Sequence, residues 1–321
     1  MSNINEKQKI IAIVGPTASG KTALSVRLAE RLGGEILCCD SMQIYRRMDV
    51  GTAKPTVSER CGIVHRLFDI AEPTEPYSCA DYVRDAQAEI AAVAQTGKLP
   101  ILCGGTGLYL DCLLRGGRFE ETVTDPALRR SLQAFSEEHG NHALHERLHE
   151  VDPESAEMIH ENNTKRVIRA LEIYMTTGMT KTEVDRRSTM FESPYDATVI
   201  GLRFADRDLL YRRIERRVDE MLENGLLEET RRLLLEGVFA RNATAAQAIG
   251  YKELLGYLNG DASLAESVEQ LKRATRRYAK RQMTWFGAKD YVHWITVDRE
   301  GEMRPFEEIL EEAQAIGVSH S

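Results

Sequence analysis

The chain has 321 residues, of which 42% are hydrophobic and 29% are charged, and its formal net charge is −8 at pH 7. This length and composition fit a soluble protein with one large domain or two smaller ones. No apolar run approaches the ~20 residues that a membrane span needs, and the acidic balance excludes a surface that is basic throughout. The polar N-terminus and six cysteines without a C-x-x-C pair predict a cytoplasmic protein with buried thiols, without zinc or disulfides.

Short apolar runs separated by helical patterns recur along the chain. They lie at residues 10–15, 35–40, 99–105, 198–204 and 292–297. Alternation of this kind favours an α/β fold, in which a parallel sheet is covered by helices on both faces.

Between the third and fourth runs, residues 119–194 show helical spacing with Pro or Gly stops and no strand pattern. This segment predicts an inserted all-helical domain. The α/β core would then consist of residues 1–118 and residues 195–321, and its second part turns helical after residue 206.

The first apolar run leads into a turn that fits G-x-x-x-x-G-K-[ST] between a strand and a helix. Backbone N–H groups of such a loop converge on phosphate oxygens, together with the positive N-terminus of the next helix. Lys21 supplies a mobile cation, and the Thr22 hydroxyl can bind Mg²⁺. The sequence therefore predicts a P-loop NTPase-like core with a phosphate site, for which a kinase is the default function. The loop comprises Gly15, Pro16, Thr17, Ala18, Ser19, Gly20, Lys21 and Thr22.

Polar residues follow the second and third predicted strands. In α/β sheets, ligands bind at the carboxyl ends of the strands. The carboxyl ends of these two strands are expected to lie next to the phosphate loop. Asp40 is either a Mg²⁺-associated carboxylate or a general base, and Ser41 and Gln43 suit the hydrogen-bonding edge of a nucleotide base. Thr106, in the segment GGTGLY, would place a hydroxyl at the same edge of the sheet. Turn glycines and helix caps are the alternative interpretation of either motif.

Two basic stripes could contact nucleic acid in spite of the net negative charge. Residues 272–281 hold six Lys or Arg and no acid, and residues 203–217 hold six Arg against three acids. We expect the first stripe, through Lys272 and Arg276, to face nucleic-acid phosphates or the ligand of the phosphate loop. A solvated helix face is the alternative for each stripe.

A second motif competes for a catalytic interpretation. Residues 145–149, HERLH, fit the H-E-x-x-H pattern of zinc peptidases. The residues that follow lack the glycine and the third histidine of the extended pattern. We interpret the segment as a solvated, histidine-rich helix.

Seven ordered segments between residues 15 and 286 resemble those of bacterial tRNA dimethylallyltransferases. They are GPTASGKT, DSMQIYRRMDVGTAKP, YSCADY, GGTGLYL, NNTKRVIRALEIYMTTG, QAIGYKEL and TRRYAKRQMTWF. Adenylate isopentenyltransferases share the phosphate loop and the Asp40 segment but are shorter, and the last two segments favour the tRNA family. A P-loop kinase using ATP and a tRNA-binding module with a degenerate loop remain the alternatives.

The resemblance implies transfer of a dimethylallyl group from its diphosphate to the N6 amine of the adenosine immediately 3′ to the anticodon. The phosphate loop would then hold a leaving group, with Mg²⁺ on Thr22. By the same resemblance, Arg217 is a further diphosphate contact with Arg213 behind it, although Arg213 could be a simple surface arginine. The catalytic residues would be Lys21, Asp40 and Thr106.

The resemblance also implies a set of tRNA contacts spread over five stretches of the chain. The partners would be the anticodon stem-loop of tRNA and dimethylallyl diphosphate, without a membrane, and we expect a monomer. The contacts would be Asp40, Ser41, Met42, Gln43, Thr106 and Arg129; Lys165, Arg166, Val167, Ile168 and Arg169; and Gln247, Ala248, Ile249, Gly250, Tyr251 and Lys252.

Overall fold

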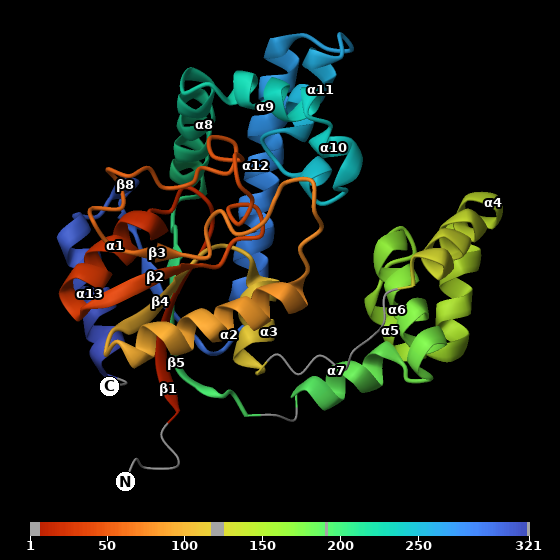
Figure 1. The fold of residues 1–321 in the computed structure, drawn as a ribbon, viewed down its shortest axis with the longest axis horizontal. Coiled ribbons are helices and arrows are strands. Elements are labelled where there is room, and N and C mark those ends of the chain that lie inside the picture. Colours follow the sequence, from red (N-terminus) through yellow and green to blue (C-terminus); the bar gives the residue numbers. More distant parts are fainter. Residues whose placement is uncertain (1–6, 117–124, 190–191, 320–321) are drawn as a thin grey trace. The chain divides into compact units, whose positions relative to one another are not determined.

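The computed structural model describes residues 7–116, 125–189 and 192–319. The chain divides into two compact units, drawn in Figure 1. Unit 1 consists of Met1–Leu114 and Pro194–Ser321, and unit 2 of Arg115–Ser193. Among the helices that the structure describes, none combines the length and apolar character needed to cross a membrane.

Unit 1 is built on a six-stranded sheet in the order β3-β2-β4-β1-β5-β6. Every neighbouring pair in it is parallel, which confirms the predicted fold class. The two-residue β3 had no strand signal in the sequence. The strands are β1 (Gln8–Val14), β2 (Gly34–Cys38), β3 (His65–Arg66), β4 (Leu99–Cys103), β5 (Tyr195–Arg203) and β6 (Val292–Thr296).

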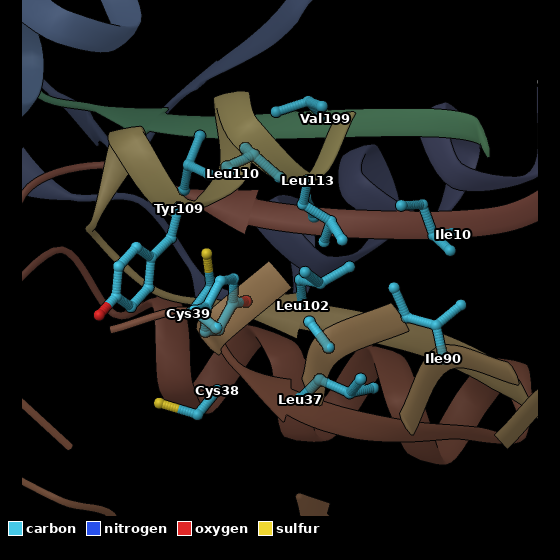
Figure 2. Packing of buried hydrophobic residues seen from close by; sticks show 14 of the residues in the cluster. Ile10, Leu37, Cys38, Cys39, Ile90, Leu102, Tyr109, Leu110, Leu113 and Val199 are labelled. Carbon is cyan, nitrogen blue, oxygen red and sulfur yellow. The ribbon is translucent and has the colours of Figure 1, made fainter. Parts of the chain in front are cut away.

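The central strand β1 is apolar on both faces, as a parallel sheet between two helical layers requires. Ile10, Ala12 and Val14 point into one core, and Ile11 and Ile13 into the other. The first core contains side chains of α2 (Cys79–Gln95) and α3 (Gly107–Leu114), and the second contains side chains of α1 (Lys21–Leu32) and α13 (Phe306–Ser319). Figure 2 shows the first core, with residues of β1, β2, β4 and β5 against Ile90, Leu110 and Leu113.

A helical layer follows β5 in the chain. Its two long helices begin at side-chain caps: Asp206 caps α8, and Ser263 with Glu266 forms a capping box on α12. Shorter helices between them enclose a third apolar core with the segment after β2. The elements are α8 (Arg207–Glu223), α9 (Leu226–Leu235), α10 (Val238–Arg241), η1 (Ala245–Gln247), α11 (Lys252–Leu258) and α12 (Leu264–Gly287), followed after β6 by β7 (Asp298–Arg299) and β8 (Glu302–Met303).

The described residues of unit 2 are helical around a core of their own. Its helices are α4 (Pro126–Val151), α5 (Pro153–Met158), α6 (Thr164–Thr177) and α7 (Lys181–Thr189). Gly140 interrupts α4 with a φ of 87°, a left-handed conformation that glycine adopts without a steric penalty. Because of this break, α4 is two helical segments joined at a kink.

The HERLH segment lies within α4, and its first histidine serves the fold. The Nε2 of His145 donates to the carbonyls of Ile159 at 2.8 Å and Ala156 at 3.0 Å, so it caps the end of α5. No cluster of three or more His, Cys, Asp or Glu able to hold a metal occurs in the described parts of the chain. The zinc-peptidase interpretation therefore loses a ligand, and His145 is half-buried rather than solvated.

Candidate active site

The loop after β1 is shaped by backbone conformations that few side chains tolerate. Gly15 and Gly20 have φ values of 135° and 93°, and Ala18 has a φ of 62°. A Cβ at Gly15 would lie 2.5 Å from the carbonyl oxygen of Leu202 on β5, so only glycine fits there. Gly20 precedes α1 without a side-chain cap. The first amides of α1 are therefore available to an anion.

Lys21 folds back over this loop. Its Nζ donates to the carbonyl oxygens of Pro16 at 2.6 Å and Gly15 at 3.0 Å. The pKa of Lys21 is lowered to about 8, mainly by burial and in part by the charge of Arg217, whereas Cys103 and Asp40 act in the opposite direction. Because both hydrogen-bond partners are neutral carbonyls, the electrostatic environment of Lys21 favours an added anion.

Two arginines of α8 reach the same loop. Arg217 donates from Nη1 to the Thr17 hydroxyl at 3.1 Å, and burial lowers the pKa of its guanidinium. Arg213 donates from Nε to the carbonyl of Ala18 at 2.9 Å. That bond places Arg213 against the loop, so it is not a simple surface arginine. The phosphate loop and these side chains form a cationic cradle. Its three cations, Lys21, Arg213 and Arg217, come from two distant parts of the chain.

Asp40 begins the turn that follows β2. Its Oδ1 accepts from the amides of Met42 at 2.9 Å and Gln43 at 3.4 Å, which fixes the carboxylate in an Asx-type turn. Its Oδ2 accepts no hydrogen bond from the residues that the structure describes. Thr106 joins this turn from the β4 side, since its hydroxyl accepts from the Ser41 amide at 3.0 Å. One oxygen of Asp40 therefore holds the turn and the other is left for a substrate.

Gln282 is a site residue that the sequence analysis did not single out. Its Oε1 accepts from the Thr17 amide at 2.9 Å, and its Nε2 donates to the carbonyl of Gly105 at 3.1 Å. A Cβ at Gly105 would lie 1.9 Å from that Nε2. Gln282 thus connects the phosphate loop to the loop of Thr106. The sequence signal that could have identified Gln282 is a polar residue inside the amphipathic helical segment TRRYAKRQMTWF.

Tyr278, one turn before Gln282 on α12, also reaches the site. Burial raises the pKa of its hydroxyl and the charge of Asp40 raises it further, while hydrogen bonds to Thr106 and Gln282 act in the opposite direction. The hydroxyl therefore stays protonated beside Thr106 and remains able to donate.

Two family models match this chain: IPP transferase over residues 43–289, and isopentenyl transferase over residues 8–72. The chain belongs to the IPP transferase family. A protein of Caldanaerobacter subterraneus subsp. tengcongensis named tRNA dimethylallyltransferase is 46% identical over 304 residues, which are 94% of this chain and 95% of the relative. Another of that name, from Geobacillus thermodenitrificans, is 50% identical over 288 residues, or 90% of each chain.

Solved structures show the same fold. A tRNA isopentenylpyrophosphate transferase from Bacillus halodurans matches with a TM-score of 0.73 and 44% identity, over 98% of this chain and 97% of that chain. A eukaryotic dimethylallyltransferase described as acting on tRNA matches with a TM-score of 0.76 and 29% identity, over 90% of this chain and 74% of that chain.

Within this IPP transferase, the predicted tRNA segment in unit 2 is only partly accessible. Lys165 and Arg166 are exposed at the start of α6, whereas Val167 and Ile168 are buried in the core of the unit. A contact of Val167 and Ile168 with tRNA stays a prediction, and it would have to come mainly from their backbone atoms. Their hydrophobic packing holds the helix that presents the two cations.

Arg129 and Arg169 have a counter-ion inside unit 2. Both donate to Glu172, whose side chain is fully buried, and Arg129 does so at 2.8 and 2.9 Å. Burial alone would raise the pKa of Glu172, but hydrogen bonds from Arg129, Arg169 and the Asp125 amide outweigh it and hold that pKa below its ordinary value. Any RNA contact by these arginines would have to share them with Glu172.

The predicted tRNA segment at residues 247–252 is also only partly accessible. Gln247 and Lys252 are exposed and Ile249 is half-buried. Ala248, Gly250 and Tyr251 are buried, so their contact with tRNA, which stays a prediction, would have to come from their backbone atoms. Their packing sets the path of the segment.

The low pKa of Lys21 predicts proton uptake when an alkyl diphosphate binds. The bound anion raises that pKa, so between about 8 and the ordinary value of about 10.4 binding requires a proton. Affinity should be flat below about pH 7.5 and weaken up to ~tenfold per pH unit above 8. Calorimetry in buffers of different ionisation enthalpy at about pH 8.5 measures the uptake.

Lys21→Arg is the matched variant, because a guanidinium stays charged over this range. It should remove the pH dependence whatever its effect on affinity. An affinity that stays flat to about pH 9.5 in the unaltered protein would contradict the linkage.

Proposed function

We propose that this protein transfers a dimethylallyl group from dimethylallyl diphosphate to the N6 amine of the adenosine immediately 3′ to the anticodon in tRNA, and releases diphosphate. One observation carries the proposal: a cationic cradle lies beside a carboxylate that keeps one oxygen available. The names of the relatives, tRNA dimethylallyltransferase, support the same reaction. We also keep the prediction of a monomer acting in the cytoplasm.

The cradle stabilises the leaving group. Negative charge develops on the diphosphate as the allylic C–O bond breaks, and fixed donors aimed at that charge lower the barrier. Lys21, Arg217 and the amides of Ala18, Ser19 and Gly20 are those donors, with Arg213 and Gln282 holding the loop in shape.

Residues of the loop fit Mg²⁺ as a cofactor. The Ser19 hydroxyl oxygen is buried and has no hydrogen-bond partner among the described residues, and Thr22 is half-buried at the first turn of α1. Mg²⁺ commonly takes few protein ligands and completes its shell with water and phosphate oxygens. Thr22 would hold the ion, which would neutralise part of the diphosphate charge.

Asp40 acts on the nucleophile. The amine of adenine is weakly nucleophilic because its lone pair is delocalised into the ring, and it must lose a proton as the N–C bond forms. A base inside a stacked loop has to be extruded to reach such a pocket. Asp40 Oδ2 would accept the proton, while Ser41, Met42, Gln43 and Thr106 contact the extruded nucleotide.

Incubation of tRNA with radiolabelled dimethylallyl diphosphate tests the reaction. Label should enter tRNA, and γ-labelled ATP offered with a panel of nucleosides should give no phosphorylated product. Phosphorylated nucleoside without prenylated tRNA would instead establish a P-loop kinase.

Asp40→Asn keeps the size of the side chain and the hydrogen bonds that Oδ1 accepts, and removes the basicity. We expect turnover to fall about 10²- to 10⁴-fold, the usual contribution of a positioned base, with small changes in both substrate affinities. Single-turnover prenylation measures the effect. Recovery of the rate at high Mg²⁺ would show that Asp40 serves the metal instead.

Residues of α12 divide into paired and unpaired cations. Lys272 pairs with Asp219 at 2.6 Å, and Arg276 pairs with Glu215 at 2.5 Å, both on α8. Arg273 and Arg277 are exposed, and neither forms an ion pair within the residues the structure describes. The tRNA contact expected of the first pair is better assigned to the second, since an ion pair must be broken before Lys272 or Arg276 can bind a phosphate.

Arg273→Ala and Arg277→Ala should each flatten the plot of log affinity for tRNA against log salt by about one unit, because each lost phosphate contact releases fewer counterions. Lys272→Ala is the matched control on the same helix and should leave the slope unchanged. If all three variants keep the slope of the unaltered protein, α12 is not part of the surface that binds RNA. Fluorescence anisotropy over a salt series measures the slope.

A further inference from the structure

Glu229, on α9, is a buried carboxylate that the reaction described above does not use. Its side chain is 6% exposed. Its Oε2 accepts from the backbone amides of Asp49 and Val50, both at 3.1 Å, and its Oε1 accepts from the amide of Gly51 at 3.0 Å. The Tyr251 hydroxyl donates to the same Oε1 at 2.7 Å.

Four donors on two oxygens match the accepting capacity of an ionised carboxylate. Successive backbone amides that converge in this way form an anion-binding concavity, which here is filled by the protein's own side chain. A glutamine would offer one accepting oxygen and would turn an NH₂ group toward the amides. Burial and the Glu229 charge raise the pKa of Tyr251, so its hydroxyl stays protonated as a donor.

The turn held by Glu229 determines the position of Gln43. The carbonyls of Thr52 and Ala53 directly follow the three amides, and Gln43 donates from Nε2 to them at 2.9 and 3.1 Å. Ala53 has a φ of 51°, so this path is not one that the backbone adopts readily. A shift of the turn would therefore move the side chain that is expected to contact the nucleotide.

Glu229 also joins this turn to the segment 247–252. A Cβ at Gly51 would lie 2.4 Å from the Tyr251 ring, and one at Gly250 would lie 2.9 Å from the Gly51 carbonyl oxygen. The two segments thus meet at backbone distance, with the carboxylate bound to both. Residues 247–252 are themselves predicted to contact tRNA, and the turn holds Gln43, for which such a contact is also predicted.

We propose that Glu229 is a positioning residue for tRNA: it locks the turn at 49–53 and Tyr251 together, so that the Asp40–Gln43 segment and residues 247–252 form one recognition surface before tRNA binds. Preorganisation of this kind increases affinity because less conformational entropy is lost on binding. The proposal rests on the proposed function, since it concerns the tRNA subsite of that reaction.

Glu229→Gln tests the proposal. The KM for tRNA should rise about 10- to 100-fold, in line with the loss of hydrogen bonds to a charged acceptor. The Kd for dimethylallyl diphosphate should stay within about threefold, because the phosphate loop is held by Lys21, Arg213 and Gln282 and not by Glu229. Steady-state kinetics, ligand titration and a thermal melt give the readouts.

Glu228→Gln removes the same charge from an exposed neighbour on α9 and should change neither constant. Tyr251→Phe deletes one of the four donors, so its KM for tRNA should rise less than that of Glu229→Gln. If Glu229→Gln does not fold, Gly51→Ala provides the second test. Its Cβ would displace Tyr251 while Glu229 remains, and the same selective rise in the KM for tRNA is expected.

An unchanged KM for tRNA in folded Glu229→Gln, or an equal loss for tRNA and dimethylallyl diphosphate, would overturn the positioning role. These results are distinct from failure of the proposed function, in which the unaltered protein would not prenylate tRNA at all.

Discussion

The site depends on close approach between backbone segments at the carboxyl ends of the strands. Gly15 lies against Leu202 of β5, Gly104 against Cys39, and Gly105 against Gln282, each at a distance that leaves no room for a Cβ. Gly15 thus holds the end of β1 against β5, while Gly104 and Gly105 hold the loop after β4 against the end of β2 and against α12. A larger side chain at Gly104 would push the loop of Thr106 away from the segment of Asp40.

Charge in this region is arranged for ligands more than for stability. Lys21 and Arg217 are held against neutral oxygens, and burial lowers the pKa of each, which destabilises the unliganded state to some extent. Buried carboxylates outside the cradle differ from these cations in having a full set of hydrogen-bond donors around them. Glu229 and Glu172 are each surrounded by donors, so their charges are satisfied inside the protein.

This contrast separates binding groups from positioning groups. A cation that points at neutral carbonyls gains from an incoming anion, whereas a carboxylate that already accepts four hydrogen bonds gains nothing from a ligand. Arg129 and Arg169 occupy an intermediate place, because their present partner is Glu172 and a phosphate would compete with it. The same comparison is the reason for proposing Arg273, and not Lys272, as an RNA contact.

The parallel sheet, the phosphate loop and the family could be predicted from the sequence alone, because strand–helix alternation and the loop's glycine spacing are local properties of the chain. The sequence also predicted that Asp40 and Thr106 lie at the same edge of the sheet, where the Thr106 hydroxyl accepts from the Ser41 amide. Which residues inside a motif are buried, and which cations already have a partner, follows from the fold and not from the motif. Val167 and Tyr251 belong to motifs predicted to contact tRNA but pack in hydrophobic cores, and Gln282 and Glu229 bind loops more than 170 residues away in sequence. Burial and pairing depend on which segment lies opposite, and that is set by packing between elements that no local pattern encodes.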